Sequence, residues 1–264
     1  MTTDYNEHAV RSALRELPRS WHRPSVLVVG ANTGSDCRRF IELGAGRVTG
    51  LDPMPDVGRD FSHPRVSYYC SPIEECLFQD QSFDLVFCFA TLEHVGDIVG
   101  AISQMARLTK PGGVIYCLAS PLWRSPQGHH MSCFGAHPWV HLLYPDRENL
   151  VAFSRQQGID GERGHSIEGI AAYIFDTDAF NRRGSAEYIA AAAALAPHFD
   201  LRSNKLVLED SAMLDHPNAI ELMRRGYSGD DLLAVTHMLI AQSSPSVGTR
   251  LYRRARRVLS SLLR

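Results

Sequence analysis

The chain has 264 residues, of which 44% are hydrophobic and 21% are charged. This composition is typical of a folded protein and excludes a largely disordered chain, and the length suffices for one elaborated domain with a sizeable core. The 27 Lys and Arg residues against 29 Asp and Glu residues give a formal net charge of −2, which excludes a strongly basic coat protein, so we expect no nucleic-acid partner.

Three further features lead us to expect a cytoplasmic protein. The longest apolar run, Ile189 to Ala196, is far shorter than the ~18 residues of a membrane span. The first residues contain neither the basic stretch nor the apolar stretch of a secretory leader. Six cysteines are scattered without a Cys-x-x-Cys pair, as expected for reduced thiols rather than a disulfide framework or a zinc ribbon.

The first half of the chain alternates short β-branched runs with helical patterns, which predicts βαβ units and a mostly parallel sheet. The runs are almost entirely apolar, as expected for strands that are covered on both faces. Five strands are expected, at Ser25 to Gly30, Arg47 to Asp52, Val66 to Cys70, Phe83 to Ala90 and Gly113 to Ser120. Helices are expected at about residues 35–44 and 97–108, with a shorter one near Ile73 to Leu77.

The pattern changes after Ser120. The stretch 121–146 is rich in Pro, Gly, His and Trp and is too long for a simple connection, so we expect a functional insertion there. Two helices, Pro145 to Gly158 and Ser185 to Ala196, and two strands, Leu201 to Glu209 and Ala234 to Gln242, are expected after it. The expected layout is an N-terminal helix (1–24), a core (25–120), an insertion (121–184), the C-terminal part of the sheet (185–243), and a linker with a basic helix (244–264).

A glycine-bounded turn, Gly30-Ala31-Asn32-Thr33-Gly34, follows the first expected strand. Glycine lets the backbone approach a ligand closely, and a helix N-terminus offers unpaired N–H groups. Asp52 ends the second strand, where a carboxylate can accept hydrogen bonds from both hydroxyls of a ribose that lies across the carboxyl edge of the sheet. Together these features predict a cofactor that contains a nucleoside.

The motifs distinguish between cofactor classes. A dinucleotide fingerprint needs Gly-x-Gly-x-x-Gly, but its second and third glycine positions are Asn32 and Ser35 here. Five motifs follow one another at Gly30 to Gly34, Leu51 to Pro53, Ser82 to Val86, Thr91 to Val95 and Leu108 to Gly113. In this order and spacing they resemble the class I S-adenosylmethionine-dependent methyltransferases, in particular the small-molecule (type 11-like) group. The resemblance covers about residues 25–120.

The resemblance implies a Rossmann-like, doubly wound α/β fold with a seven-stranded, mostly parallel sheet, an insertion after the fifth strand, and S-adenosyl-L-methionine as the cofactor. It implies cofactor contacts by Gly30, Ala31, Asn32, Thr33, Gly34, Asp52, Pro53, Ile73, Ala90, Thr91 and Leu92. Val28, Asn32 and Pro72 depart from the family's pattern, since acids are usual at the first and third positions and glycine at the second. A cofactor-binding partner protein without catalysis and an NAD-dependent oxidoreductase therefore stay open as alternatives.

Histidines are the candidate general bases, because transfer of a methyl group to an aliphatic or sugar hydroxyl requires proton removal near neutral pH. His94 follows the fourth expected strand, and His129 and His130 lie in the insertion. Aromatic residues beside them suit a sugar ring, so we expect O-methylation of a polar small molecule such as a sugar or glycan precursor. No carboxylate lies among the insertion's histidines and their spacing matches no helical ligand pair, so we expect no metal.

The segment 250–264 contains six arginines and no acid. On a helix its leucines, with Ala255 and Val258, fall in one arc of about 140°, opposite the arginines. Such a helix can lie on an anionic membrane surface or against a protein partner, and it can equally pack its leucines on its own domain. The first alternative would place the protein at the inner membrane surface.

Overall fold

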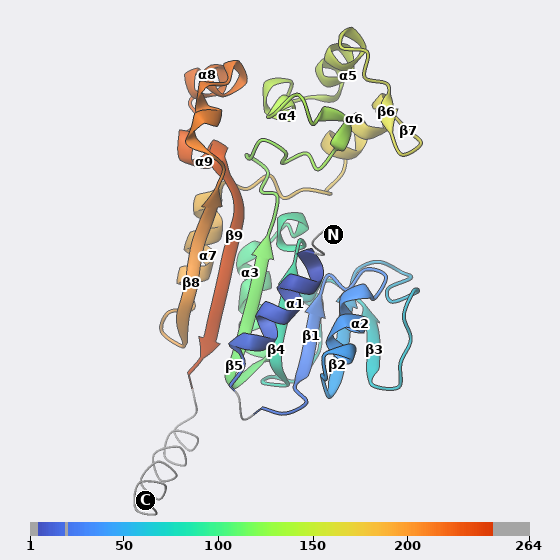
Figure 1. The fold of residues 1–264 in the computed structure, drawn as a ribbon, viewed down its shortest axis with the longest axis vertical. Helices are drawn as coiled ribbons and strands as arrows, with labels where there is room; N and C mark the ends of the chain where they lie inside the picture. Colours follow the sequence, from blue (N-terminus) through green and yellow to red (C-terminus); the bar gives the residue numbers. More distant parts are fainter. Residues whose placement is uncertain (1–4, 19–20, 245–264) are drawn as a thin grey trace, which may run out of the picture.

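The computed structural model describes residues 5–18 and 21–244, and a seven-stranded sheet runs through this part (Figure 1). Its first five strands in chain order are β1 (Ser25–Val29), β2 (Arg47–Asp52), β3 (Val66–Cys70), β4 (Phe83–Phe89) and β5 (Thr109–Ala119). Two further strands, β8 (Phe199–Leu208) and β9 (Ala234–Ser243), complete it. The basic helix expected at 250–264 lies outside the described residues.

The strand order across the sheet is β3-β2-β1-β4-β5-β9-β8. Strands β1 to β5 pair in parallel, whereas β9 runs antiparallel to both β5 and β8. The expected seven-stranded, mostly parallel sheet is therefore confirmed. The chain order reverses between β1 and β4, and in open α/β sheets ligands bind outside the carboxyl ends of the strands at such a point.

Helices cover both faces of the sheet. On one face lie α1 (Tyr5–Glu16) and α2 (Ser35–Glu42), and on the other lie α3 (Ile98–Leu108) and α7 (Ser185–Ala193) (Figure 1). The carboxylate of Asp97 accepts a 2.9 Å hydrogen bond from the N–H of Gly100, so α3 begins with an acidic side-chain cap. The short helix expected near Ile73 is a single 3₁₀ turn, η1 (Ile73–Glu75).

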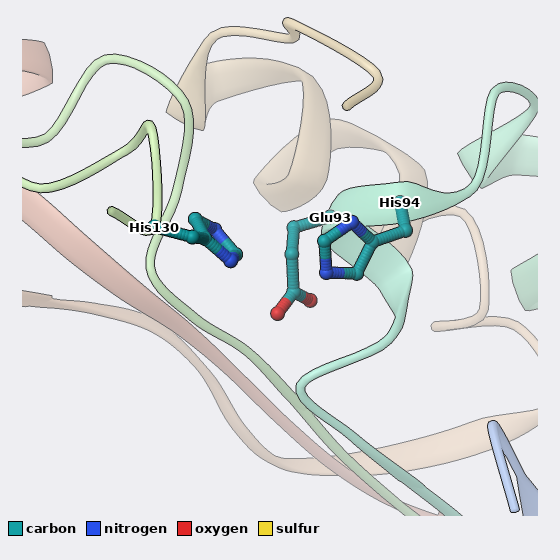
Figure 2. Close-up of side chains that lie close together, drawn as sticks. All are labelled: Glu93, His94 and His130. Carbon is teal, nitrogen blue, oxygen red and sulfur yellow. The ribbon is translucent and has the colours of Figure 1, made fainter. Parts of the chain in front are cut away.

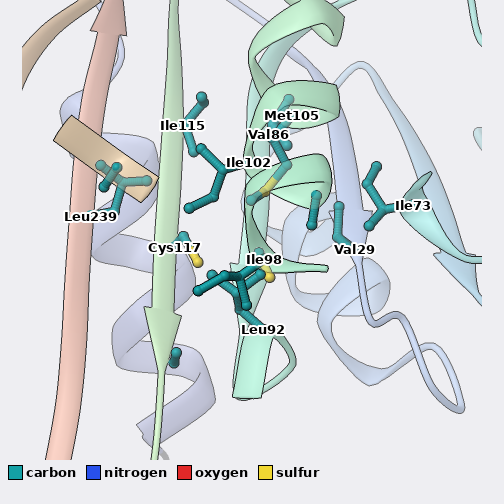
Figure 3. Close-up of a cluster of buried hydrophobic side chains, with 14 of the residues drawn as sticks. Val29, Ile73, Val86, Leu92, Ile98, Ile102, Met105, Ile115, Cys117 and Leu239 are labelled. Atoms are coloured by element: carbon teal, nitrogen blue, oxygen red, sulfur yellow. The ribbon is translucent and has the colours of Figure 1, made fainter. Parts of the chain in front are cut away.

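A continuous apolar core lies between the sheet and α3 and α7. Val86 of β4, Ile115 of β5 and Leu239 of β9 point into it, and Ile102 and Met105 of α3 meet them there (Figure 3). These side chains are almost fully buried, and removing their apolar surface from water is the dominant favourable contribution to folding. This rigid core fixes the strand ends that carry the site.

A second layer of structure, which we call the cap, stands over the carboxyl ends of β4 and β5 (Figure 1). Its first part is residues 121–184, with η3 (Ser132–Phe134), α4 (Val140–Leu143), α5 (Arg147–Gln156), the hairpin β6 (Gly161–Glu162) and β7 (His165–Ser166), and α6 (Ile167–Phe175). Its second part, residues 211–233 between β8 and β9, contains η4 (Ser211–Asp215), α8 (Pro217–Arg224) and α9 (Gly229–Leu233). The sequence analysis did not anticipate this second part, because the region 185–243 was expected to return to the sheet.

The two parts of the cap share one core. The fully buried Trp139 packs with Ile170 from the first part and with Leu222 from the second, and its indole N–H donates a 3.0 Å hydrogen bond to the carbonyl of Leu232. Within residues 5–18 and 21–244, no helix combines the length and the apolar character that crossing a bilayer demands.

Candidate cofactor and active site

A cavity of about 590 Å³ opens where the carboxyl ends of β1, β2 and β4 meet the cap. The sheet side contributes the ends of β1 and β2 and the turns after β3 and β4, and the cap contributes Tyr173, Asp178 and Ala179. Its size lies within the range of small-molecule and cofactor sites. The cavity is thus at the point where the chain order of the sheet reverses.

Residues 30–34 form a tight turn at the floor of this cavity. Gly30 has φ +77°, and a Cβ atom there would lie 2.0 Å from the hydroxyl oxygen of Thr91, so only glycine allows the turns after β1 and β4 to approach so closely. Asn32 has φ +45°, a left-handed conformation that asparagine adopts more readily than most residues. The expected replacement of a family glycine by Asn32 is therefore compatible with the turn.

The carboxylate of Asp52 is fixed at the end of β2. One oxygen accepts a 2.9 Å hydrogen bond from the N–H of Asn32, and the other accepts a 2.9 Å hydrogen bond from the N–H of Met54. Each carboxylate oxygen has a further lone pair. Because Asp52 lines the cavity, these lone pairs can accept hydrogen bonds from the two hydroxyls of a ribose.

The turn after β3 forms the next wall of the cavity. Residues 71–74 line it, and the N–H of Ser71 donates a 3.0 Å hydrogen bond to the carbonyl of Asp52. Ile73 is 3% exposed and provides an apolar surface on which an adenine ring can lie. Pro72 has no N–H and no carboxylate, so it cannot itself donate a hydrogen bond to such a ring or bind it as an acid would.

The 3₁₀ turn η2 (Leu92–His94) connects the sheet to the cap. The Nδ1 atom of His94 lies 2.5 Å from the carbonyl oxygen of Ala179, so this nitrogen carries the proton and Nε2 carries the lone pair. Asn181 of the same cap loop donates to the carbonyls of Leu92 and Val95, at 2.9 and 3.0 Å. These contacts hold the loop over the cavity and orient the imidazole of His94.

Glu93 lies beside His94 and is 2% exposed. Neither carboxylate oxygen has a hydrogen-bond partner among the described residues. Burial raises the pKa of Glu93 to about 8, although backbone N–H groups nearby partly oppose this effect. Together with His94 and His130 this carboxyl group forms a compact cluster (Figure 2).

The two histidines of the insertion have different surroundings. His130 is half-buried, its Nε2 lies 3.0 Å from the carbonyl oxygen of Pro121, and its ring centroid lies 5.1 Å from that of His94. Burial lowers the pKa of His130 to about 4. His129 is fully buried in the cap against Phe134, and burial lowers its pKa to about 2. This placement argues against the expected role of His129 as a general base.

The expected cofactor residues divide into two groups. Seven of them line the cavity, namely Gly30, Asn32, Asp52, Pro53, Ile73, Ala90 and Thr91. Ala31 and Leu92 are buried in the two cores on either side of the sheet, Thr33 lines a groove beside α2, and Gly34 faces the hydroxyl of Tyr68. These four residues do not line the cavity.

Sequence reasoning missed three residues of this site. Glu93 lies directly beside the expected His94, so the Glu-His pair was a usable signal. Tyr173 and Asn181 lie far along the chain from the cofactor motifs, and only the fold of the cap brings them to the cavity and its covering loop. The expected alternative bases, His94 and His130, are in contact at one end of the cavity.

Known proteins similar to this chain bear on the identity of the cofactor. Residues 27–117 match the family model described as "Methyltransferase domain". The chain is 30% identical over 171 residues to the ubiquinone biosynthesis O-methyltransferase of Bordetella avium, which covers 57% of this chain and 69% of that protein. It is 27% identical over 157 residues to the protein of the same name from Bradyrhizobium sp. (strain ORS 278), covering 51% and 60% of the two chains. The structure of an S-adenosylmethionine-dependent methyltransferase from Mesorhizobium loti shares the fold, with a TM-score of 0.54 and 15% identity over 90% of this chain and 98% of that chain.

The fold and the site therefore define a protein built to bind an adenosine-containing cofactor at the switch point of its sheet. This chain belongs to the class I S-adenosylmethionine-dependent methyltransferases. The expected family, fold and cofactor are thereby confirmed, and the NAD-dependent alternative loses its basis. The chain spans 60% of the length of the Bradyrhizobium relative and 53% of that of a Rhodopseudomonas palustris relative.

Proposed function

We propose that the protein transfers the methyl group of S-adenosylmethionine to a hydroxyl oxygen of a small-molecule acceptor. The observation that carries the proposal is a single cavity that joins the ribose-binding carboxylate of Asp52 to the imidazole of His94. The names of the relatives, which are O-methyltransferases, support oxygen as the acceptor atom.

Different residues around the cavity contact different parts of the cofactor. Asp52 accepts hydrogen bonds from the ribose, and Ile73 with its neighbours borders the adenine. Gly30, Ala90 and Thr91 border the remaining part, and this leaves the reactive end of the cofactor next to His94. The cap loop at Asp178 and Ala179 covers that end and limits access of water, which favours transfer to the acceptor over hydrolysis.

In this arrangement His94 can accept the proton of the acceptor hydroxyl. The cofactor supplies a methyl group on a positively charged sulfur; the bond to the acceptor oxygen forms as the carbon–sulfur bond breaks, and the electron pair of that bond stays on sulfur. His94 accepts the hydroxyl proton at Nε2, while the carbonyl of Ala179 holds Nδ1–H and stabilises the resulting imidazolium. His94 is thus the general base of the proposed reaction.

The identity of the acceptor is the finer part of the proposal. The argument for a sugar rested on aromatic rings in the insertion, but Phe134 and Trp139 are fully buried and Trp123 is 8% exposed. The fourth ring, of the half-buried Tyr144, stacks on Phe153 and lines neither this cavity nor the neighbouring one beside His130. That argument therefore loses its structural support. Because the relatives are named for ubiquinone biosynthesis, precursors of ubiquinone are the first acceptors to test, and sugar alcohols are the second.

Incubation with S-adenosylmethionine labelled with ¹³C on the methyl group tests the proposal. We expect a labelled methoxy carbon in the NMR spectrum of a hydroxylated acceptor, and loss of most of the rate in His94→Asn, because general bases contribute roughly 10²- to 10⁴-fold. The control is His198→Asn, an exposed histidine at the far end of the sheet. Tight binding of S-adenosylhomocysteine without transfer to any hydroxylated acceptor would instead favour a non-catalytic partner protein.

A further inference from the structure

A second cavity, which we call the cap cavity, lies in the cap next to the cofactor cavity. Its volume is about 350 Å³, and its wall includes His130 and Tyr173. Tyr173 also lines the cofactor cavity, and the ring centroid of His130 lies 5.1 Å from that of His94. The cap cavity therefore adjoins the end of the cofactor cavity at which His94 stands.

The lining of the cap cavity has two kinds of side chain. Met131, Ile170 and the ring of Tyr173 offer apolar surface. Two basic side chains, those of Arg163 and His165, come from the hairpin of β6 and β7. Apolar lining with a few polar groups is typical of small-molecule sites. This lining suits a molecule that has an apolar part and an anionic part.

The hairpin presents Arg163 in an unfavourable backbone conformation. The hairpin packs beside α6 (Figure 1), and Glu162 pairs with His165 across it, so Arg163 and Gly164 form a two-residue turn. Both turn residues have positive φ, at +50° and +83°, and the first position of such a turn favours Asn or Gly. Residues held in rarely populated conformations are concentrated at functional sites. The use of arginine here therefore favours a binding role for its guanidinium.

The charge of Arg163 has no direct partner among the described residues, since its guanidinium makes no hydrogen bond or ion pair with them. The neighbouring carboxylate of Glu162 is held instead by Ser132 and Cys133, whose Oγ–H and backbone N–H donate to it at 2.6 and 2.5 Å. The hydrogen bond from Ser132 lowers the pKa of Glu162, and the nearby charge of Arg163 adds to this effect. The acid is thus already bound on the protein side, and the guanidinium is available to a ligand.

We propose that the cap cavity binds the methyl acceptor and that Arg163 binds an anionic group of this acceptor, a carboxylate or a phosphate. This inference rests on the proposed function. A guanidinium is always charged and donates two parallel hydrogen bonds to either anion, and the ring of His165 beside it offers a further donor. The acceptor is therefore a small hydroxylated acid.

The position of Arg163 also determines which oxygen is methylated. The positively charged sulfur of the cofactor attracts any anion, so a carboxylate that is free to turn toward it would compete with the hydroxyl for the methyl group. With the anion held at Arg163 and the apolar part against Ile170, the hydroxyl extends past Tyr173 toward Nε2 of His94. The basic end of the cap cavity thus keeps the acid away from the methyl group.

Calorimetric titration of the full chain saturated with S-adenosylhomocysteine tests this inference without methyl transfer. The probes are 4-hydroxybenzoate, 4-hydroxyphenyl phosphate and the neutral 4-hydroxybenzamide, which share a hydroxylated ring. We expect at least one of the two anions to bind at least about tenfold more tightly than the amide, because it gains charge-assisted hydrogen bonds. The anion that binds more tightly identifies the group that the cap cavity takes.

Substitutions of Arg163 show where the preference arises. Arg163→Gln abolishes the preference for the anion over the amide, whereas Arg163→Lys keeps the charge and retains part of it. The matched control is Arg224→Gln, an exposed arginine of α8 that lines neither cavity, and it leaves the preference unchanged. All three variants keep the wild-type affinity for S-adenosylhomocysteine, since both arginines lie outside the cofactor cavity.

Three results would overturn the inference. They are no binding of either anion at millimolar concentration, equal affinities of the wild type for anion and amide, and a preference for the anion that persists in Arg163→Gln. Failure of the proposed function looks different, because it removes methyl transfer or binding of S-adenosylhomocysteine while the preference for the anion remains.

Discussion

The half of the sheet that holds the cofactor and the cap that covers it are built in different ways. Strands β1, β2 and β4 are each a short, largely buried run bounded by turn residues, so each is visible in its own stretch of sequence. The cap combines residues 121–184 with residues 211–233, and buried side chains from both parts form one shared core. The difference teaches that local pattern determines the cofactor site, whereas the acceptor side depends on contacts between distant segments.

We expect the largest loss of folding stability from a substitution in the core that joins the two parts of the cap. Trp139→Ala removes a fully buried indole and leaves the carbonyl of Leu232 without its 3.0 Å hydrogen bond. Replacing a buried Trp by Ala costs about 3 to 5 kcal/mol, so the free energy of unfolding falls by that amount in denaturant titrations. If the cap unfolds independently, the titration shows an earlier transition that the sheet does not share.

Ile220→Ala is the matched control for this variant. Ile220 lies on α8 of the same cap but is 37% exposed, so truncating it removes little buried surface. We expect its free energy of unfolding to change by less than about 1 kcal/mol. Equal losses in the two variants would contradict a shared cap core centred on Trp139.

The same contrast explains what could be predicted from the sequence. Gly30 and Asp52 are identifiable because a turn and an acid at strand ends are local features, and the structure places both on one cavity. Glu93 and His130 come together only through the cap, so no local pattern in the sequence places them side by side. His129 was indistinguishable from its neighbour His130, yet one ring packs on Phe134 in the cap and the other contacts the ring of His94.

Gly30 tests the close approach of two turns in the sheet half. In Gly30→Ala a Cβ atom would lie 2.0 Å from the hydroxyl oxygen of Thr91 at φ +77°. A left-handed conformation costs roughly 1 to 2 kcal/mol and overpacking a further 1 to 3, so we expect a loss of about 2 to 5 kcal/mol in the free energy of unfolding, measured by urea titration.

Gly44→Ala separates the two contributions to that loss. Gly44 also has positive φ, at +96°, but nothing lies within 4 Å of the Cβ position. Only the conformational cost of roughly 1 to 2 kcal/mol remains there. If Gly30→Ala is no less stable than Gly44→Ala, the close approach of Thr91 to position 30 adds no cost beyond the backbone conformation.

The next largest effect is expected from substitution of Asp52, and it concerns cofactor affinity rather than folding stability. Asp52→Ala removes the acceptor proposed for the ribose hydroxyls and the two 2.9 Å bonds that hold Asn32 and Met54. We expect binding of S-adenosylhomocysteine, measured by calorimetry, to weaken by roughly 1.5 to 3 kcal/mol. Asp200→Ala, an exposed acid on β8, serves as the control. An unchanged dissociation constant for Asp52→Ala would contradict the proposal that Asp52 binds the ribose.

The smallest effect concerns acid stability in the sheet. His237 of β9 is fully buried, its Nε2 lies 2.8 Å from the Oδ1 of Asn204, and its Nδ1 has no partner among the described residues. Protonation would place a positive charge and an unpaired N–H in the core, and burial accordingly lowers the pKa of His237 to about 4. The unfolded chain, with the ordinary histidine pKa of about 6.5, therefore binds the proton more readily than the folded protein.

The sign of the pH dependence follows from this difference. The stability contributed by neutral His237 is fully present above about pH 6.5 and is lost as the pH falls toward 4, because only the unfolded state gains the proton there. Between pH 7.5 and pH 5 the loss is about 2 kcal/mol at 1.36 kcal/mol for each pH step. His237→Gln keeps a donor for Asn204 and cannot titrate, so its free energy of unfolding falls less steeply over this range than that of the wild type. His198→Gln, at an exposed histidine, is the control. Equal slopes for all three proteins would show that His237 is not the source of the acid sensitivity.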